Sequence, residues 1–190
     1  VVRGSQRAMV VADLPFGSYE ASPELALATS VRFFKESGVM AVKLEGAHIE
    51  TVKKLTASGI PVMGHLGLTP QSMHQLGGYR VQGRTDGDAI LEAALALEAA
   101  GAFAIVLELV PAELAARITA ALAIPTVGIG AGVNCDSQVL VWTDLMGITK
   151  KAPKLAKAYR NLRAEMLAAT TEFADDVRAG NFPTEAQTFN

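Results

Sequence analysis

Short apolar stretches alternate with longer segments of helical pattern along most of the chain. Continuous, β-branched apolar runs bounded by Gly, Pro or polar residues are typical of strands that are buried on both faces of a sheet. Six runs are predicted to be strands, the last of them only at its beginning: Met9–Leu14, Met40–Gly46, Ile60–Leu66, Ala102–Val110, Pro125–Gly130 and Val139–Ile148.

Helical patterns lie between most of these runs. Ser22–Glu36 begins with a candidate N-cap serine and a proline, and Gly38 ends it. Asp88–Ala100 and Pro111–Leu122 place apolar residues three or four positions apart, on one helix face. A longer amphipathic helix is predicted over about residues 152–180.

The alternation of strand and helix, at a spacing of about 25–35 residues, predicts repeated βαβ units and a parallel sheet. Two parallel architectures fit this pattern, an open doubly wound sheet and a (β/α)8 TIM barrel, and the pattern alone does not decide between them. The chain length predicts one domain or two, and because the pattern indicates no second domain, we expect a single domain over residues 1–190 that includes the C-terminal helical segment.

Net charge and cysteine content indicate which partners and which cellular compartment to expect. The net charge of -2 gives no electrostatic reason to expect nucleic acid or an anionic membrane as a partner. Cys135 is the only cysteine, so we expect no intrachain disulfide and a reducing, cytoplasmic location. No apolar run approaches the ~18 residues that span a bilayer, and the first residues lack the pattern of a signal peptide.

Ionisable residues end four successive predicted strands. The two-residue period of a strand places Asp13, then Lys43 with Glu45, then His65, then Glu108 on a single face. The carboxyl ends of parallel strands build active sites, and burying unpaired charges is costly, so this pattern indicates a site. A structural ion-pair network is the alternative. Three carboxylates against one lysine instead favour a hard divalent cation such as Mg²⁺.

Other polar features carry weaker signals. His48 and His74 are predicted to be surface loop residues, and Cys135 is predicted to have no catalytic role. The glycine cluster Gly128–Gly132 fits either an anion cradle at a helix N-terminus or a tight turn. The polar, glycine-rich segment Leu76–Arg84 is predicted to be a long loop over the site.

Six segments, in the same order along the chain, resemble ketopantoate hydroxymethyltransferases (3-methyl-2-oxobutanoate hydroxymethyltransferases). They are VVADLPFGSYEASPE (Val10–Glu24), AVKLEG (Ala41–Gly46), GIPVMGHLGLTPQS (Gly59–Ser72), LGGYRVQGR (Leu76–Arg84), LALEAAGAFAIVLELVPAELA (Leu95–Ala115) and IPTVGIGAG (Ile124–Gly132). The resemblance implies a (β/α)8 barrel in which the predicted strands are the third to the eighth. It also implies that two earlier strands, with an Asp-Ser pair that binds metal and keto acid, belong to the complete site, so we expect the site in this chain to be incomplete.

The same resemblance implies an activity and its partners. Family members transfer a hydroxymethyl group from 5,10-methylenetetrahydrofolate to 3-methyl-2-oxobutanoate, giving ketopantoate for pantothenate synthesis. They use Mg²⁺ or a similar cation and form homo-oligomers, often decamers. Two alternatives stay open: another Mg-dependent keto-acid lyase or mutase of the same barrel class, and an inactive truncated barrel.

Residue roles follow from matching positions. By resemblance, Asp13 and Glu45 lie in the metal shell, directly or through water, and Asp13 also contacts the keto acid. Lys43 would hold the substrate carboxylate or the enolate oxygen. Glu108 matches the catalytic base of the family. His65 is expected to orient the substrate or a metal-bound water, with a structural role as the alternative.

Overall fold

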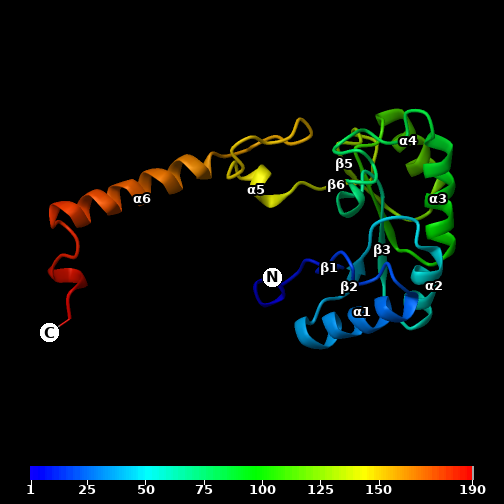
Figure 1. Cartoon of the computed structure of the whole chain (residues 1–190), viewed down its shortest axis with the longest axis horizontal. Coiled ribbons are helices and arrows are strands. Elements are labelled where there is room, and N and C mark those ends of the chain that lie inside the picture. The colour runs from blue at the N-terminus through cyan, green and yellow to red at the C-terminus, as the bar shows by residue number, and fades with distance from the viewer. Residues whose placement is uncertain (190) are drawn as a thin grey trace. The chain divides into compact units, whose positions relative to one another are not determined.

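The computed structural model describes residues 1–189, and the chain divides into two compact units, Val1–Val139 and Leu140–Asn190 (Figure 1). The first unit contains the whole parallel sheet and the helices between its strands. The second contains two helices, of which the C-terminal one is the longer. The expectation of a single domain over residues 1–190 stays a prediction.

The sheet has six parallel strands in sequential order, which decides between the two architectures that the sequence leaves open. A doubly wound sheet reverses its strand order at one point, whereas a barrel adds each strand on the same side of the previous one. Helices α1 to α4 accompany the strands on one side of the sheet (Figure 1). The observed topology is therefore that of a partial barrel. Its strands are β1 (Val11–Asp13), β2 (Ala41–Lys43), β3 (Val62–Gly67), β4 (Ala104–Glu108), β5 (Thr126–Ile129) and β6 (Ser137–Gln138).

Local sequence signals account for the first helix. Helix α1 (Pro23–Ser37) begins after Ser22, whose hydroxyl accepts the backbone N–H of Leu25 at 3.1 Å, and it has a proline at its first position. It ends at Gly38, which adopts a left-handed conformation with φ 71°. Both boundaries agree with the sequence prediction to within one residue. The other long helices of this unit are α3 (Gly87–Ala99) and α4 (Ala112–Ala121), also close to prediction.

Helix α2 (Ile49–Ala57) has no counterpart among the predicted helices. It is only nine residues long, and its first turn contains no capping side chain that would signal a start. Its buried face is nevertheless regular, because Val52 and Leu55 are fully buried in the core.

The core lies between the sheet and these helices. Val42, Leu44, Ile105 and Leu107 are fully buried and belong to one apolar cluster that includes residues of α2, α3 and α4. Burying a side chain of this size stabilises the fold by roughly 1.5–3 kcal/mol. Because these residues alternate with Lys43 at the end of β2 and with Glu108 at the end of β4, their burial directs the two ionisable side chains to the opposite face.

The sixth strand is shorter and earlier than predicted. Ser137–Gln138 pairs with β5, whereas the apolar run Val139–Ile148 forms the short helix α5 (Trp142–Leu145). An apolar run of this length cannot be assigned to strand or helix from its periodicity alone. Val141 and Trp142 are also more than half exposed, so the run is not the buried strand that its composition suggests.

The C-terminal helix α6 (Leu162–Ala179) begins ten residues later than the predicted start near residue 152. Asn161 is its N-cap, and its side chain accepts a backbone N–H of the first turn. Just before the helix and at its first residue, the backbone N–H groups of Tyr159 and Leu162 donate to the carbonyls of Leu145 and Met146. These bonds attach the preceding segment to the end of α5, so its amides are not available for a helix.

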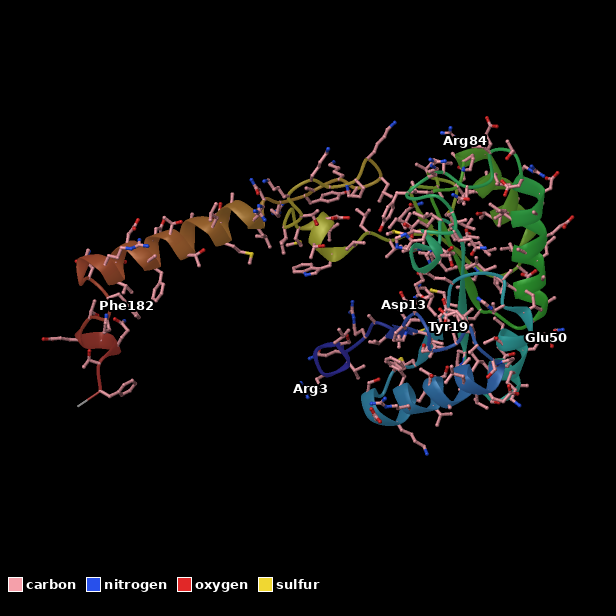
Figure 2. All side chains as sticks on the ribbon, viewed as in Figure 1. Arg3, Asp13, Tyr19, Glu50, Arg84 and Phe182 are labelled. Atoms are coloured by element: carbon pink, nitrogen blue, oxygen red, sulfur yellow. The ribbon has the colours of Figure 1, made fainter. Side chains whose placement is uncertain are left out.

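The apolar stripe of α6 is exposed within the second unit. Met166, Phe173 and Val177 are 59%, 55% and 48% exposed, and the helix has no buried residue (Figure 2). The ring of Phe173 contacts that of Phe182, with centroids 5.4 Å apart. Across residues 1–189, no helix is long and apolar enough to cross a membrane.

The outer edges of β1 and β6 lead to a testable expectation. Over the described residues the sheet is open, so both strands present backbone groups that can pair with another chain. We expect the purified 190-residue chain to associate and to bind an apolar dye. Light scattering after gel filtration, with dye fluorescence, measures both. A monomeric mass with cooperative unfolding and no dye binding contradicts this expectation.

Candidate active site

The candidate residues come from the carboxyl ends of β1 to β4, and the strand register brings them together. Asp13 lies opposite Lys43, and His65 lies opposite Val106, two residues before Glu108. Lys43 lies opposite Met63, so His65 and Glu108 each lie two residues beyond the site residue of the preceding strand, a stagger of the kind found in barrels. The predicted common face is present, although the functional roles of these residues stay predictions.

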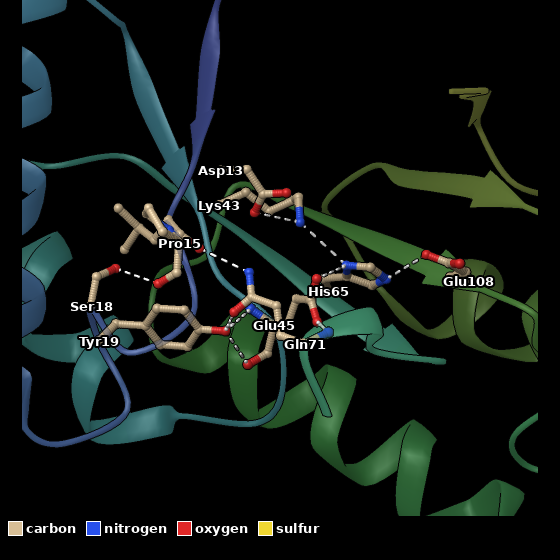
Figure 3. A network of polar contacts seen from close by, with 10 residues as sticks. Asp13, Pro15, Ser18, Tyr19, Lys43, Glu45, His65, Gln71 and Glu108 are labelled. Carbon is tan, nitrogen blue, oxygen red and sulfur yellow. Dashed lines mark hydrogen bonds and ion pairs between the residues drawn. The ribbon is translucent and has the colours of Figure 1, made fainter. Parts of the chain in front are cut away.

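A chain of close polar contacts crosses these four strands (Figure 3). The Nζ atom of Lys43 lies 2.7 Å from Oδ1 of Asp13 and 3.3 Å from Nδ1 of His65. On the other side of the imidazole, Nε2 of His65 lies 3.3 Å from Oε2 of Glu108. Lys43 and His65 thus separate the carboxylates of Asp13 and Glu108.

These contacts indicate the tautomer of His65. A lysine ammonium has three donors and no acceptor, so Nδ1 of His65 accepts from Lys43 and the proton of the neutral ring lies on Nε2. The His65 side chain is only 4% exposed. Within residues 1–189, Nε2 has no hydrogen-bond partner, even though Oε2 of Glu108 lies 3.3 Å away. A buried N–H donor is therefore available beside Glu108.

Glu45 is the most deeply buried carboxylate of the site. Its side chain is 5% exposed. Oε2 accepts the backbone N–H of Gln71 at 2.9 Å, and Oε1 lies 3.9 Å from Nδ1 of His65. A buried carboxylate is costly unless it is paired or hydrogen-bonded, and one backbone donor compensates only part of this cost. The free oxygen of Glu45 is suited to a cation or a substrate donor.

Two uncharged residues, Tyr19 and Gln71, complete the surroundings of Glu45 (Figure 3). The Tyr19 hydroxyl donates to Oε1 of Gln71 at 2.7 Å and accepts the backbone N–H of Glu45 at 3.2 Å. Burial raises the pKa of Tyr19 to about 12, so its hydroxyl remains a donor. Both residues lie in segments that resemble the family, but neither carries a charge or ends a predicted strand, so the sequence predicts no role for them.

Glu108 is positioned by its backbone. Its carbonyl accepts the backbone N–H of Leu68 at 2.8 Å. The end of β3 approaches this carbonyl so closely that only glycine fits at Gly67. A Cβ there would contact that carbonyl and would lie 2.6 Å from Cγ2 of Val110. Leu109, which follows Glu108, has the positive φ of 47° that non-glycine residues rarely adopt. Such strain is typical of functional sites.

Asp13 and Glu45 supply oxygen ligands of the kind that Mg²⁺ prefers. Over the described part of the chain, no group of three or more His, Cys, Asp or Glu side chains could hold a metal ion. Two carboxylates suit a hard cation that takes its other ligands from water and substrate oxygens, since Mg²⁺ usually keeps several waters. The donor set therefore fits a magnesium ion chemically, and the assignment stays a proposal.

The three weaker candidates do not join this cluster directly. His48 immediately precedes α2, and its ring packs edge-on against Tyr19 with centroids 5.4 Å apart. His74 is exposed, as predicted. Cys135 is buried, and the neighbouring Asp136 accepts the backbone N–H of Thr126 at 2.8 Å, which holds the pKa of that carboxyl below its usual value.

The two glycine-rich loops have different outcomes. Gly128–Gly132 leads into turns before β6 and no helix follows it there, so the tight-turn interpretation is correct. Leu76–Arg84 forms no regular helix or strand. The backbone N–H of Gln82 donates to the carbonyl of Leu109 at 2.9 Å, so this loop is attached next to Glu108.

The family model and the curated relatives that match this chain name the same enzyme family. A family model described as ketopantoate hydroxymethyltransferase matches residues 1–185. Curated relatives named 3-methyl-2-oxobutanoate hydroxymethyltransferase include those of Frankia alni (60% identical, covering 97% of this chain and 62% of the relative), Acidothermus cellulolyticus (58%, covering 100% and 71%) and Saccharopolyspora erythraea (58%, covering 100% and 66%).

The chain spans 62% to 71% of the length of these curated relatives. Among solved structures, a putative phosphonomutase from Burkholderia cenocepacia J2315 has a TM-score of 0.48 at 17% identity and covers 91% of this chain and 72% of that one. This score is too low to support an inference about chemistry.

Proposed function

The chain belongs to the ketopantoate hydroxymethyltransferase family, and on this premise we propose that the whole protein transfers a hydroxymethyl group from 5,10-methylenetetrahydrofolate to 3-methyl-2-oxobutanoate, giving ketopantoate. The observation that carries the proposal is the chain of contacts from Asp13 through Lys43 and His65 to Glu108. It combines an oxygen ligand, a fixed positive charge, a neutral donor and a candidate base on one face.

Glu108 is proposed to take the proton from C3 of the keto acid. The bonding electrons of the C3–H bond move towards the keto oxygen and form an enolate, whose C3 then bonds to the one-carbon unit of the folate. Both C–N bonds of that unit break and release tetrahydrofolate. Water supplies the hydroxyl group of the product, and the second water proton and the proton taken from C3 end on the two folate nitrogens. A base must lie within reach of C3 without being bound to a metal. Glu108 meets the second condition, because Lys43 and His65 stand between it and Asp13.

Lys43 and His65 are proposed to bind the oxygens that become more negative as the enolate forms. Lys43 offers a positive charge that is 16% exposed, and His65 offers a buried N–H. Fixed donors of this kind favour a transition state because they need no rearrangement when charge develops. Asp13 and Glu45 would hold the Mg²⁺ ion, which when bound polarises the keto group of the substrate.

We also propose that the protein works in the reducing cytoplasm as a homo-oligomer, a decamer. The single cysteine, Cys135, is consistent with the compartment. The open strand edges and the exposed apolar stripe of α6 are consistent with association between chains.

Proton NMR of a reaction mixture tests the proposed activity. With Mg²⁺, 3-methyl-2-oxobutanoate and 5,10-methylenetetrahydrofolate, we expect a new hydroxymethyl signal that grows with protein concentration and is absent when the folate is omitted. Conversion of the keto acid without folate would instead indicate a lyase or mutase. No conversion in either mixture, with the protein folded, contradicts an enzymatic role.

A further inference from the structure

Glu45 depends on two residues that carry no charge. Its carboxylate has one hydrogen-bond donor among the described residues, the backbone N–H of Gln71, which binds Oε2 at 2.9 Å. A backbone donor is only as well placed as the segment that carries it. Gln71 lies in η2 (Pro70–Ser72), a single three-residue turn after β3 that is too short to be rigid by itself.

The side chain of Gln71 holds this turn in place. Its Nε2 donates to the carbonyl of Leu14 at 2.9 Å, just beyond β1, and its Oε1 accepts the hydroxyl of Tyr19 at 2.7 Å. The Tyr19 hydroxyl in turn accepts the backbone N–H of Glu45 at 3.2 Å. Gln71 therefore connects the ends of β1, β2 and β3 around one carboxylate (Figure 3).

The result is a carboxylate with two unequal oxygens. Oε2 accepts the backbone N–H of Gln71, whereas Oε1 lies 3.9 Å from Nδ1 of His65. We propose that Tyr19 and Gln71 are positioning residues that orient Glu45 so that Oε1 alone is presented to a divalent cation. The inference rests on the proposed function, in which Glu45 is a metal ligand, and it adds the residues that set the affinity of that site.

The burial of this group of contacts explains why its loss would affect the site. Tyr19 is 2% exposed, so water cannot easily replace a hydroxyl that is removed from it. Without that hydroxyl, Oε1 of Gln71 and the backbone N–H of Glu45 both lose a partner. Residues that orient a metal ligand in this way typically contribute 10- to 100-fold to metal affinity.

Calorimetric titration with Mg²⁺ tests this proposal on Tyr19→Phe, Gln71→Ala and the double variant. We expect each single variant to bind Mg²⁺ about tenfold more weakly than the parent protein. The double variant should be no weaker than Gln71→Ala by more than about twofold, because the two residues act through one network. Tyr159→Phe is the matched control, since it removes the same atom from a side chain that is 55% exposed, and its affinity should be unchanged.

Thermal unfolding of each variant and Mg²⁺ titration of Asp13→Ala and Glu45→Ala complete the experiment. Thermal unfolding of each variant shows whether it is folded at the titration temperature. If Gln71→Ala is not folded, Tyr19→Phe, which removes a single oxygen, decides the question. Affinities within twofold of the parent in folded Tyr19→Phe and Gln71→Ala, while Asp13→Ala binds weakly, overturn the positioning role and leave the proposed function standing. Unchanged affinity in Asp13→Ala and Glu45→Ala as well overturns both.

Discussion

In the whole protein, the Glu108→Gln variant should exchange the C3 proton of 3-methyl-2-oxobutanoate with deuterated solvent at least about 100-fold more slowly than the parent protein. Glutamine keeps the shape of the side chain but cannot accept the proton. The affinities for Mg²⁺ and for the keto acid should persist, because Glu108 contacts His65 and is separated from the proposed metal ligand Asp13. The loss should therefore be confined to proton transfer.

Proton NMR in deuterated water with Mg²⁺ follows this exchange directly and needs no folate. Glu113→Gln makes the same chemical change on an exposed position of α4 and should exchange at the parent rate. Asp13→Ala should lose metal affinity and exchange together, which distinguishes a ligand from a base. Parent-like exchange in Glu108→Gln would place the base elsewhere, and His65, at the end of the adjacent strand, would be the next candidate.

Replacing either Asp13 or Glu45 by alanine should weaken Mg²⁺ binding by more than about 100-fold, beyond the usual effect of residues that only orient a ligand. In the proposed site, Asp13 and Glu45 each supply a negatively charged oxygen ligand, so the loss of either one leaves the ion with less compensating charge. Removing Asp13 also leaves the Lys43 ammonium, 2.7 Å away in the structure, without its partner, so the vacated position becomes more repulsive to a cation.

Calorimetric titration of both variants measures the effect. Asp88→Ala removes an exposed carboxylate that is paired with Arg117, and it provides the control for a general change in charge. Its affinity should match that of the parent. If Asp13→Ala and Glu45→Ala both bind Mg²⁺ as the parent does, the two residues are not the metal ligands.

The sequence was sufficient to predict which four ionisable residues share one face of the sheet, because that placement depends on the alternation of side chains along strands. Period-two alternation in parallel strands places Asp13, Lys43, His65 and Glu108 on one face, and the sequential strand order makes the four strands neighbours. The choice between barrel and open sheet was different. It depends on strand order, which repeated βαβ patterns do not encode.

Contacts between distant loops were beyond the sequence pattern. The hydroxyl of Tyr19 and the amide of Gln71 are 52 positions apart, and neither residue carries a charge that would mark it. The order of charges across the site was also unpredictable. Counting three carboxylates against one lysine suggested a single acidic cluster, but the order of the strands places Lys43 and His65 between Asp13 and Glu108.

The start of α6 shows a third limit. The amphipathic pattern is continuous from about residue 152, and it contains nothing that forbids a helix there. The backbone N–H groups of Tyr159 and Leu162 instead bind carbonyls at the end of α5, and tertiary bonds of this kind override local propensity.

Gly67 has a consequence for how this protein can vary. It contributes no functional group, yet any side chain there would press on the carbonyl of Glu108 and on Val110. A saturation mutagenesis screen should therefore find this position as intolerant as the proposed base itself. A search for functional residues that considers only reactive side chains would overlook Gly67, although it limits which substitutions the contact between β3 and β4 can accept during evolution.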